Sequence, residues 1–184
     1  MRILLLSSLL CLLLGSCEPE PFQINLAGYS IQFPTTLGEL QSLHPRGHKK
    51  YRSIFVDSSQ AVKIEWWFDI WSNTGNQDPK NKPHGIVMFL KNKDPQFDSV
   101  KTALEQRFKQ RLKPLVFTKL NGDFSRVKPI YVCHINKDVF LVLTKSDSFR
   151  SEPNSLRIAI GYNLTRKEEE TFALLGGKIY SDKL

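Results

Sequence analysis

The sequence predicts an α+β fold that consists mainly of an antiparallel sheet, with one long helix and two short helices. Two observations predict this class. Several short segments alternate between apolar and polar side chains, which is typical of strands that bury one face. One longer segment repeats apolar residues at helical spacing instead. Short turns between successive strand segments favour antiparallel pairing.

The first half of the expected domain contains a strand, a short helix and three further strands. The first strand is expected within 22–33. A helix is expected at 37–43, where Thr36 and Glu39 have the spacing of a capping box. A long polar loop is expected at 72–83. The three strands that follow the helix are expected at 51–56, 62–69 and 86–90.

The second half is expected to have the same order with a longer helix. Asp94 and Pro95 have the chemistry of a helix start, and Pro114 is expected to end the helix. A short closing helix is expected to begin at Thr165, after a strand in which Arg157 faces outward. The buried stripe of the long helix is expected to be Phe97, Val100, Leu104, Phe108 and Leu112. The later strands are expected at 127–135, 139–144 and 156–162.

A helix followed by three strands is therefore expected twice, near 37–91 and 95–163. We expect two such units to pack as one antiparallel sheet with helices on one face. This topology resembles the helix-plus-meander units of small envelope lipoproteins and of β-lactamase-inhibitor-like proteins. The resemblance is one of topology, so it carries an expectation about fold and none about a site.

The amino terminus has the pattern of an export signal. Arg2 precedes an almost wholly apolar run at 3–14, which is shorter than the about 20 residues of a transmembrane helix. The run leads into Leu14-Gly15-Ser16-Cys17. This motif resembles the lipobox of bacterial lipoproteins, in which an aliphatic residue and two small residues precede a cysteine. The resemblance implies a diacylglyceryl group on Cys17 and cleavage just before it by a signal peptidase.

These features divide the chain into three expected parts. Residues 1–16 are the lipoprotein signal peptide, residues 17–21 are a short tether, and residues 22–184 are a single α+β domain. Pro19 and Pro21 resist helix and sheet, so they stiffen the tether.

Lipid on Cys17 would make the membrane a partner of this protein. Each buried CH₂ contributes about 0.8 kcal/mol, so two or three acyl chains hold a domain stably. The alternative is an ordinary signal peptide in which the cysteine is incidental. The next residue is Glu18, not the aspartate associated with inner-membrane retention, so the outer membrane is favoured over the inner membrane within the cell envelope.

The expected mature chain is basic. Without Arg2 it has 25 Lys and Arg against 18 Asp and Glu, a net charge of +7. An exported domain rarely meets nucleic acid, so no nucleic-acid partner is expected. Attraction to anionic lipid or to an acidic protein partner explains the charge, and simple solubility is the alternative.

The sequence contains no recognisable metal or catalytic constellation, so neither a metal nor a cofactor is expected. His44 and His48 are four residues apart, but Pro45 and Gly47 preclude the helix that would align them, and an exposed loop is expected. Glu65 and Asp69 share a strand face about 13 Å apart, at roughly 3.3 Å per residue. That separation is too long for hydrolysis by two carboxylates.

Cys133 and His134 do not form a nucleophile and base in this interpretation. They are neighbours on an expected strand, so their side chains point to opposite faces. Cys133 is the only cysteine left once Cys17 carries lipid and Cys11 is removed with the signal. We expect Cys133 to be a buried small hydrophobe.

The best candidate for a binding surface is the aromatic segment 66–71. Alternation buries Trp66 and Phe68 and turns Trp67 outward, while Trp71 leads into the polar loop. Exposed tryptophans often anchor binding surfaces, so Trp67 and Trp71 are the candidate partner-binding residues. The alternative is that Trp67 packs under a helix on the second face of the sheet.

These observations predict a lipid-anchored envelope protein that is a non-catalytic protein-binding module, such as an assembly accessory or an immunity-type lipoprotein. A small-ligand-binding lipoprotein, in which aromatic side chains line a pocket, is the alternative. A hydrolase is a distant third, because no nucleophile is accompanied by a base.

Overall fold

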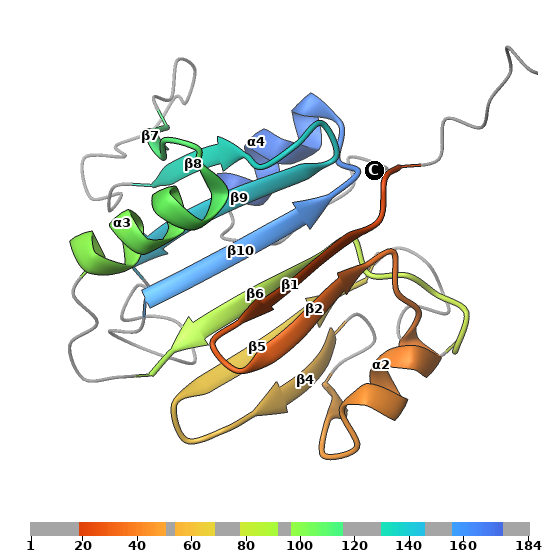
Figure 1. Ribbon diagram of the computed structural model, residues 1–184. Coiled ribbons are helices and arrows are strands. Elements are labelled where there is room, and N and C mark those ends of the chain that lie inside the picture. The colour runs from red at the N-terminus through yellow and green to blue at the C-terminus, as the bar shows by residue number, and fades with distance from the viewer. Residues whose placement is uncertain are drawn as a thin grey trace, which may run out of the picture.

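The computed structural model describes residues 19–50, 54–68, 78–91, 97–115, 130–145 and 156–174. These residues form two antiparallel sheets and three helices (Figure 1). The prediction of an α+β fold that consists mainly of antiparallel sheet is confirmed at this level.

A β-hairpin opens the fold. β1 (Phe22–Leu26) and β2 (Tyr29–Phe33) pair antiparallel and form a two-stranded sheet of their own. The expectation of one strand at 22–33 is wrong, because the chain reverses at Ala27 and Gly28, whose φ angles are 50° and 84°. Two successive positive φ angles are typical of a type I′ turn, whose twist suits a two-residue hairpin.

The larger sheet has eight strands in the order β3-β4-β5-β6-β10-β9-β8-β7, and all neighbours are antiparallel. Two four-stranded meanders therefore meet where β6 pairs with β10. The first meander contains β3 (His48–Lys50), β4 (Ile54–Ser58), β5 (Val62–Trp67) and β6 (Gly85–Leu90). The second contains β7 (Lys113–Pro114), β8 (Tyr131–His134), β9 (Val139–Lys145) and β10 (Leu156–Tyr162).

Helices α2 (Leu37–Leu43) and α4 (Arg166–Leu174) begin where their capping residues predict. Thr36 Oγ1 accepts the Glu39 N–H, and the Glu39 carboxylate accepts the Thr36 N–H at 2.7 Å. Thr165 and Glu168 form the same reciprocal pair before α4. Each capping box satisfies backbone donors that have no partner within the helix.

Helix α3 (Phe97–Phe108) is shorter than expected. Lys109 has a left-handed φ of 54°, which ends the helix before Pro114. Leu112 therefore lies beyond the helix, although it remains buried in the same core as Leu104. The expected start at Asp94 and Pro95 lies outside the described residues.

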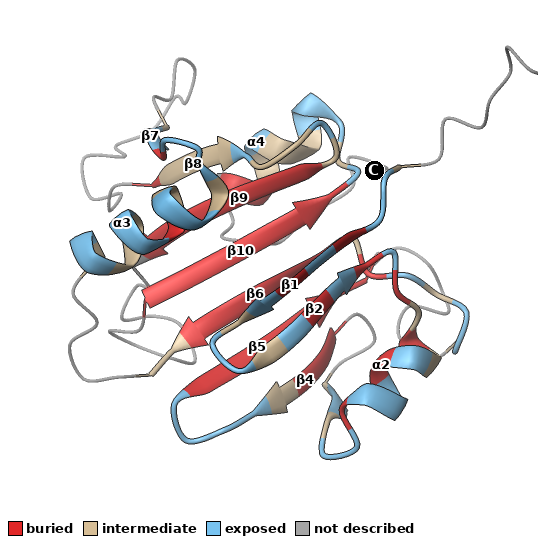
Figure 2. Cartoon of the chain, viewed as in Figure 1, coloured by how far each residue is buried: buried red, intermediate tan, exposed pale blue. Residues whose placement is uncertain are grey.

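The two faces of the large sheet pack against different elements. The first face packs against the β1–β2 hairpin, α2 and α3, through a core that includes Ile31, Leu37 and Leu104. The second face packs against α4 through Phe172 and Ala173. Figure 2 shows that β6, β9 and β10 are buried along most of their length, as expected for strands covered on both sides.

Close contact between α4 and the sheet depends on two glycines. Gly85 and Gly161 are direct partners across β6 and β10. A Cβ atom at Gly85 would lie 2.8 Å from a ring carbon of Phe172 and 2.8 Å from the Ile160 carbonyl oxygen. The aromatic ring therefore occupies the space that a side chain would need.

Replacing Gly85 with alanine should lower the free energy of unfolding by about 1–3 kcal/mol, the usual cost of overpacking. The Ile160 carbonyl belongs to the central strand pair, so it has little freedom to move. Urea unfolding of the chain without residues 1–16 measures the effect. The matched control is Gly38→Ala in α2, where the nearest atom is 3.4 Å away and the helix favours alanine. Equal stability of wild type and G85A would contradict the prediction.

Candidate functional site

The folded body holds the chain immediately after the predicted lipid site. Cys17 itself lies outside the described residues. The Glu20 N–H donates to Asp138 Oδ2 at 3.0 Å, and the Tyr162 hydroxyl donates to the Glu20 carbonyl at 3.0 Å. Lys137 Nζ lies 3.9 Å from Glu20 Oε1. Residues from Glu20 onward are thus part of the domain, not of a free tether ending at residue 21.

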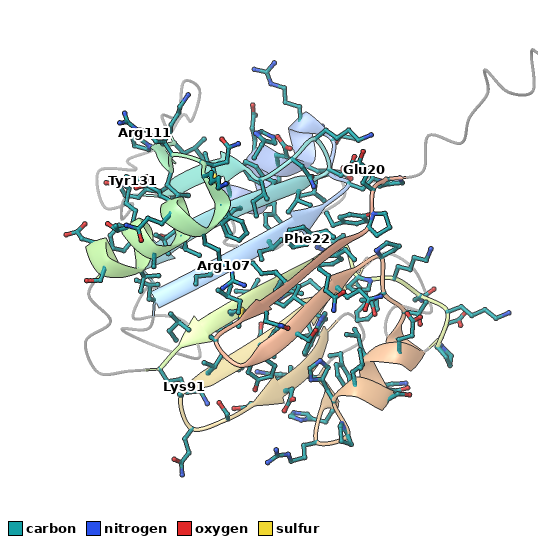
Figure 3. The ribbon with its side chains drawn as sticks, in the orientation of Figure 1. Glu20, Phe22, Lys91, Arg107, Arg111 and Tyr131 are labelled. Carbon is teal, nitrogen blue, oxygen red and sulfur yellow. The ribbon has the colours of Figure 1, made fainter. Side chains whose placement is uncertain are left out.

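These contacts define two ends of the molecule. Asp138 lies in the β8–β9 turn and Tyr162 is the last residue of β10, so we call this side the anchor end (Figures 1 and 3). The β1–β2 and β4–β5 turns lie at the other side of the sheet, which we call the distal end. β10 has seven residues, so the two ends are roughly 20 Å apart at about 3.3 Å per residue.

A cleft of about 480 Å³ opens at the distal end. Three segments line it, namely the β1–β2 turn region at 27–30, the end of α2 at 43–46, and the end of β4 at 57–59. We call it the distal cleft. Its lining combines acidic, basic, hydroxyl and aromatic side chains, from Asp57, Arg46, Ser58 and Tyr29.

His44 is the most buried titratable side chain of the distal cleft, with 9% of its surface exposed. Its Nδ1 lies 3.2 Å from Asp57 Oδ2, and its ring centroid lies 4.5 Å from that of Trp66. Burial lowers the pKa of His44 below 6.5, and this effect exceeds the opposing influence of Asp57. The imidazole is therefore neutral at pH 7, and its Nδ1 carries the proton that faces the carboxylate.

The other ring nitrogen of His44, Nε2, differs from Nδ1 in its hydrogen bonding. Nε2 is buried and accepts no hydrogen bond from the part of the chain that the structure describes. Two hydroxyl groups of the cleft have other partners: Lys91 Nζ donates to Ser58 Oγ at 2.9 Å, and Ser59 Oγ bonds with the backbone of Val62. Because Nε2 is buried, a ligand in the cleft can bond to it only if the ring or its neighbours move.

The expectation of an exposed loop at 44–48 is wrong for His44, which is buried, and correct for His48 only in its exposure, because His48 begins a strand. His44 folds back against Trp66 and the end of β4, whereas His48 lies exposed on β3. Sequence spacing does not predict the His44–Asp57 pair, because a strand and a turn separate the two residues. Among the described residues, no group of three His, Cys, Asp or Glu side chains could hold a metal ion.

The expectation that Trp67 faces solvent is wrong. Trp67 is 8% exposed and belongs to the core of the second face, together with Phe172 of α4. Alternation correctly separates it from the buried Trp66 and Phe68, but both faces of β5 are covered. Trp71 lies outside the described residues, so its assignment stays a prediction.

The second face also buries charged side chains. Lys63 Nζ lies 2.9 Å from Glu65 Oε1, and both side chains are less than a tenth exposed. Lys63 and Arg157 lie 5.0 and 5.3 Å from the ring centroid of Phe89. Arg157 points away from the first face as expected, but it is only 3% exposed. Glu65 is thus engaged in an ion pair, while Asp69 lies outside the described residues.

Cys133 and His134 point to opposite faces, as predicted. Cys133 packs against the first core, and burial raises the pKa of its thiol to about 11, so the thiol stays protonated at neutral pH. His134 Nε2 lies 2.8 Å from Glu169 Oε1 on α4, beside the ring of Phe140.

No protein-family model, curated protein or solved structure matches the chain. Within the described part of the chain, no helix has the length and apolar character needed to cross a membrane.

The burial of His44 should make the protein less stable in mild acid. The unfolded chain takes up a proton at this residue near pH 6.5, but the folded protein does so only at lower pH. The unfolded state therefore binds more protons as the pH falls below about 6.5, and the free energy of unfolding decreases. Urea unfolding between pH 7.5 and 5.0 should show a smaller decrease for His44→Phe than for wild type. The exposed control, His48→Asn, should follow wild type, and an unchanged slope in H44F would refute this assignment.

Proposed function

We propose that this chain is a lipid-anchored protein of a bacterial cell envelope, and that its folded part is a non-catalytic module that binds another protein. The Leu14-Gly15-Ser16-Cys17 motif supports lipid attachment at Cys17. The hydrogen bonds that hold the Glu20 backbone to Asp138 and Tyr162 support it too, because they fix the chain three residues after Cys17.

The short link from Cys17 to Glu20 is the observation that carries the proposal. An extended chain spans at most about 3.6 Å per residue, so three residues span about 11 Å. The hydrogen bonds from Glu20 and Tyr162 then keep the anchor end close to the bilayer. The distal end faces away from the membrane, where a partner in the same compartment can reach it. Glu18 after the cysteine favours the outer membrane.

A small-ligand-binding lipoprotein is the second candidate, and the distal cleft favours it. Its volume of about 480 Å³ lies within the about 300–1,000 Å³ typical of ligand sites. Tyr29 and His44 both line the cleft, with their ring centroids 5.9 Å apart. Under this hypothesis, native mass spectrometry of protein purified from its envelope should detect a bound small molecule, and His44→Phe should reduce its occupancy.

We also propose that the fold consists of two equivalent helix-plus-meander units. The first contains α2 with β3 to β6, and the second contains α3 with β7 to β10. Each helix precedes four strands instead of the three expected from the sequence. The strand order supports this proposal. On each side of the β6–β10 pair the four strands of one unit follow one another in chain order, and β6 and β10 are the last strands of their units.

Replacing Cys17 with serine should release the protein from membranes. Serine has no thiol to receive the diacylglyceryl group, so the acyl chains that hold the domain are lost. Fractionation of cells that express the full chain should find wild type in the membrane pellet and C17S outside it. Mass spectrometry of the wild-type amino terminus should find a lipidated cysteine.

The matched control is Cys133→Ser, which removes a thiol that is half-buried on β8. C133S should remain with the membranes. The anchoring proposal would be refuted if C17S associated with membranes as wild type does and if Cys17 of the wild-type protein were unmodified.

A further inference from the structure

A groove of about 520 Å³ runs between β1 and α3. β1 contributes residues 22–25, and α3 contributes Arg107 and Phe108. Figure 3 shows Arg107 in the space between the helix and β1. The groove shares no lining residue with the distal cleft, so it is a separate candidate for binding.

Among the described strands, only β2 pairs with β1, so the backbone of β1 has an open edge along this groove. Leu26 and Tyr29 flank the two-residue turn as its closing pair. Hydrogen-bonded and non-hydrogen-bonded pairs alternate from such a closing pair. The N–H and C=O groups of Gln23 and Asn25 therefore point away from β2. In the described residues, no backbone hydrogen bond from another element reaches them.

The side chains of β1 leave that edge accessible. Phe22 and Ile24 are buried against the first face of the sheet, whereas Gln23 and Asn25 are exposed. An additional strand would lie about 4.8 Å from β1, on the side of β1 where the groove opens. Strand addition to an exposed edge uses main-chain hydrogen bonds for affinity and side-chain contacts for specificity.

The groove has one basic residue on its helix side. Arg107 lines the groove and is exposed, whereas Arg111 lies beside Tyr131 and away from β1 (Figure 3). The carboxylate of Glu105, on the same helix, already has two other partners. It accepts the Leu112 N–H at 2.8 Å and pairs with Lys101 at 3.3 Å. The exposed guanidinium of Arg107 favours an anionic group on the partner.

We propose that an extended acidic segment of a partner protein binds in this groove as a third strand on β1. Its backbone pairs with the outward groups of Gln23 and Asn25, and one of its carboxylates pairs with Arg107. This inference rests on the proposed protein-binding function and names the class of partner. It differs from a purely electrostatic contact because it requires hydrogen bonds from both backbones.

Two synthetic peptides test the charge of the partner. One alternates Val and Glu, and the other alternates Val and Lys; both carry a fluorescent label. Fluorescence anisotropy with the soluble C17S protein should detect binding of the acidic peptide only, and its affinity should fall as salt rises. Arg107→Glu should weaken binding at least tenfold, whereas Arg107→Lys should retain most of it. Equal binding of both peptides would overturn the proposal.

Backbone pairing is tested separately. Asn25→Pro removes the outward N–H and should abolish binding, while Asn25→Ala keeps this N–H and should bind like wild type. An acidic peptide N-methylated at alternate residues tests the same contact without changing the protein, and it should not bind. Full binding of the N-methylated peptide would overturn strand addition, even if N25P fails to fold.

Two further outcomes would assign the groove to another occupant and overturn the proposal. A wild-type dimer that N25P converts to a monomer, measured by light scattering, would assign the edge to a second copy. Strong hydrogen-exchange protection of the Gln23 and Asn25 amides in the free monomer would mean that the chain itself covers the edge. Because all of these measurements use C17S, their failure leaves lipid anchoring untouched, and membrane fractionation tests anchoring alone.

Discussion

The pairing of β6 with β10 is the contact on which the rest of the fold depends. It joins residues about 70 positions apart in the sequence and unites the two meanders in one sheet, in a register that runs from Leu90 with Leu156 to Gly85 with Gly161. Both strands are buried almost throughout. The register also brings the two glycines together beneath α4, which lets the helix close the second face. A slip by one residue would exchange the faces and remove this fit.

The same register separates the features that matter for function. Tyr162 ends β10 beside Glu20, so the chain leaves the body at the anchor end. The turn after β4 lies at the other end of the sheet, where Asp57 meets His44. The distal cleft is thus held by three turns, whereas the groove beside β1 follows a strand. The two sites therefore differ in chemistry. The cleft is lined by side chains from three segments, whereas the groove has backbone groups of β1 opposite Arg107.

Local signals in the sequence determined a large part of the secondary structure. Capping boxes fixed the starts of α2 and α4, and apolar alternation fixed the bounds of β10. Alternation also placed Cys133 and His134 on opposite faces. These features depend on residues within a few positions of one another, so a linear pattern contains all the information that they require.

Only the tertiary structure decided which faces are covered and which side chains meet. Alternation puts Trp67 opposite Trp66, but whether its face is solvated depends on α4, whose sequence lies about 100 residues away. The same holds for the burial of Arg157 and for the contact between His44 and Asp57. The sequence by itself determined the expected lipid site at Cys17, the helix starts and the strand periods. Packing between distant segments decided which side chains are buried. A side chain is buried only when a second surface covers it, and the pattern along one strand describes only the first surface.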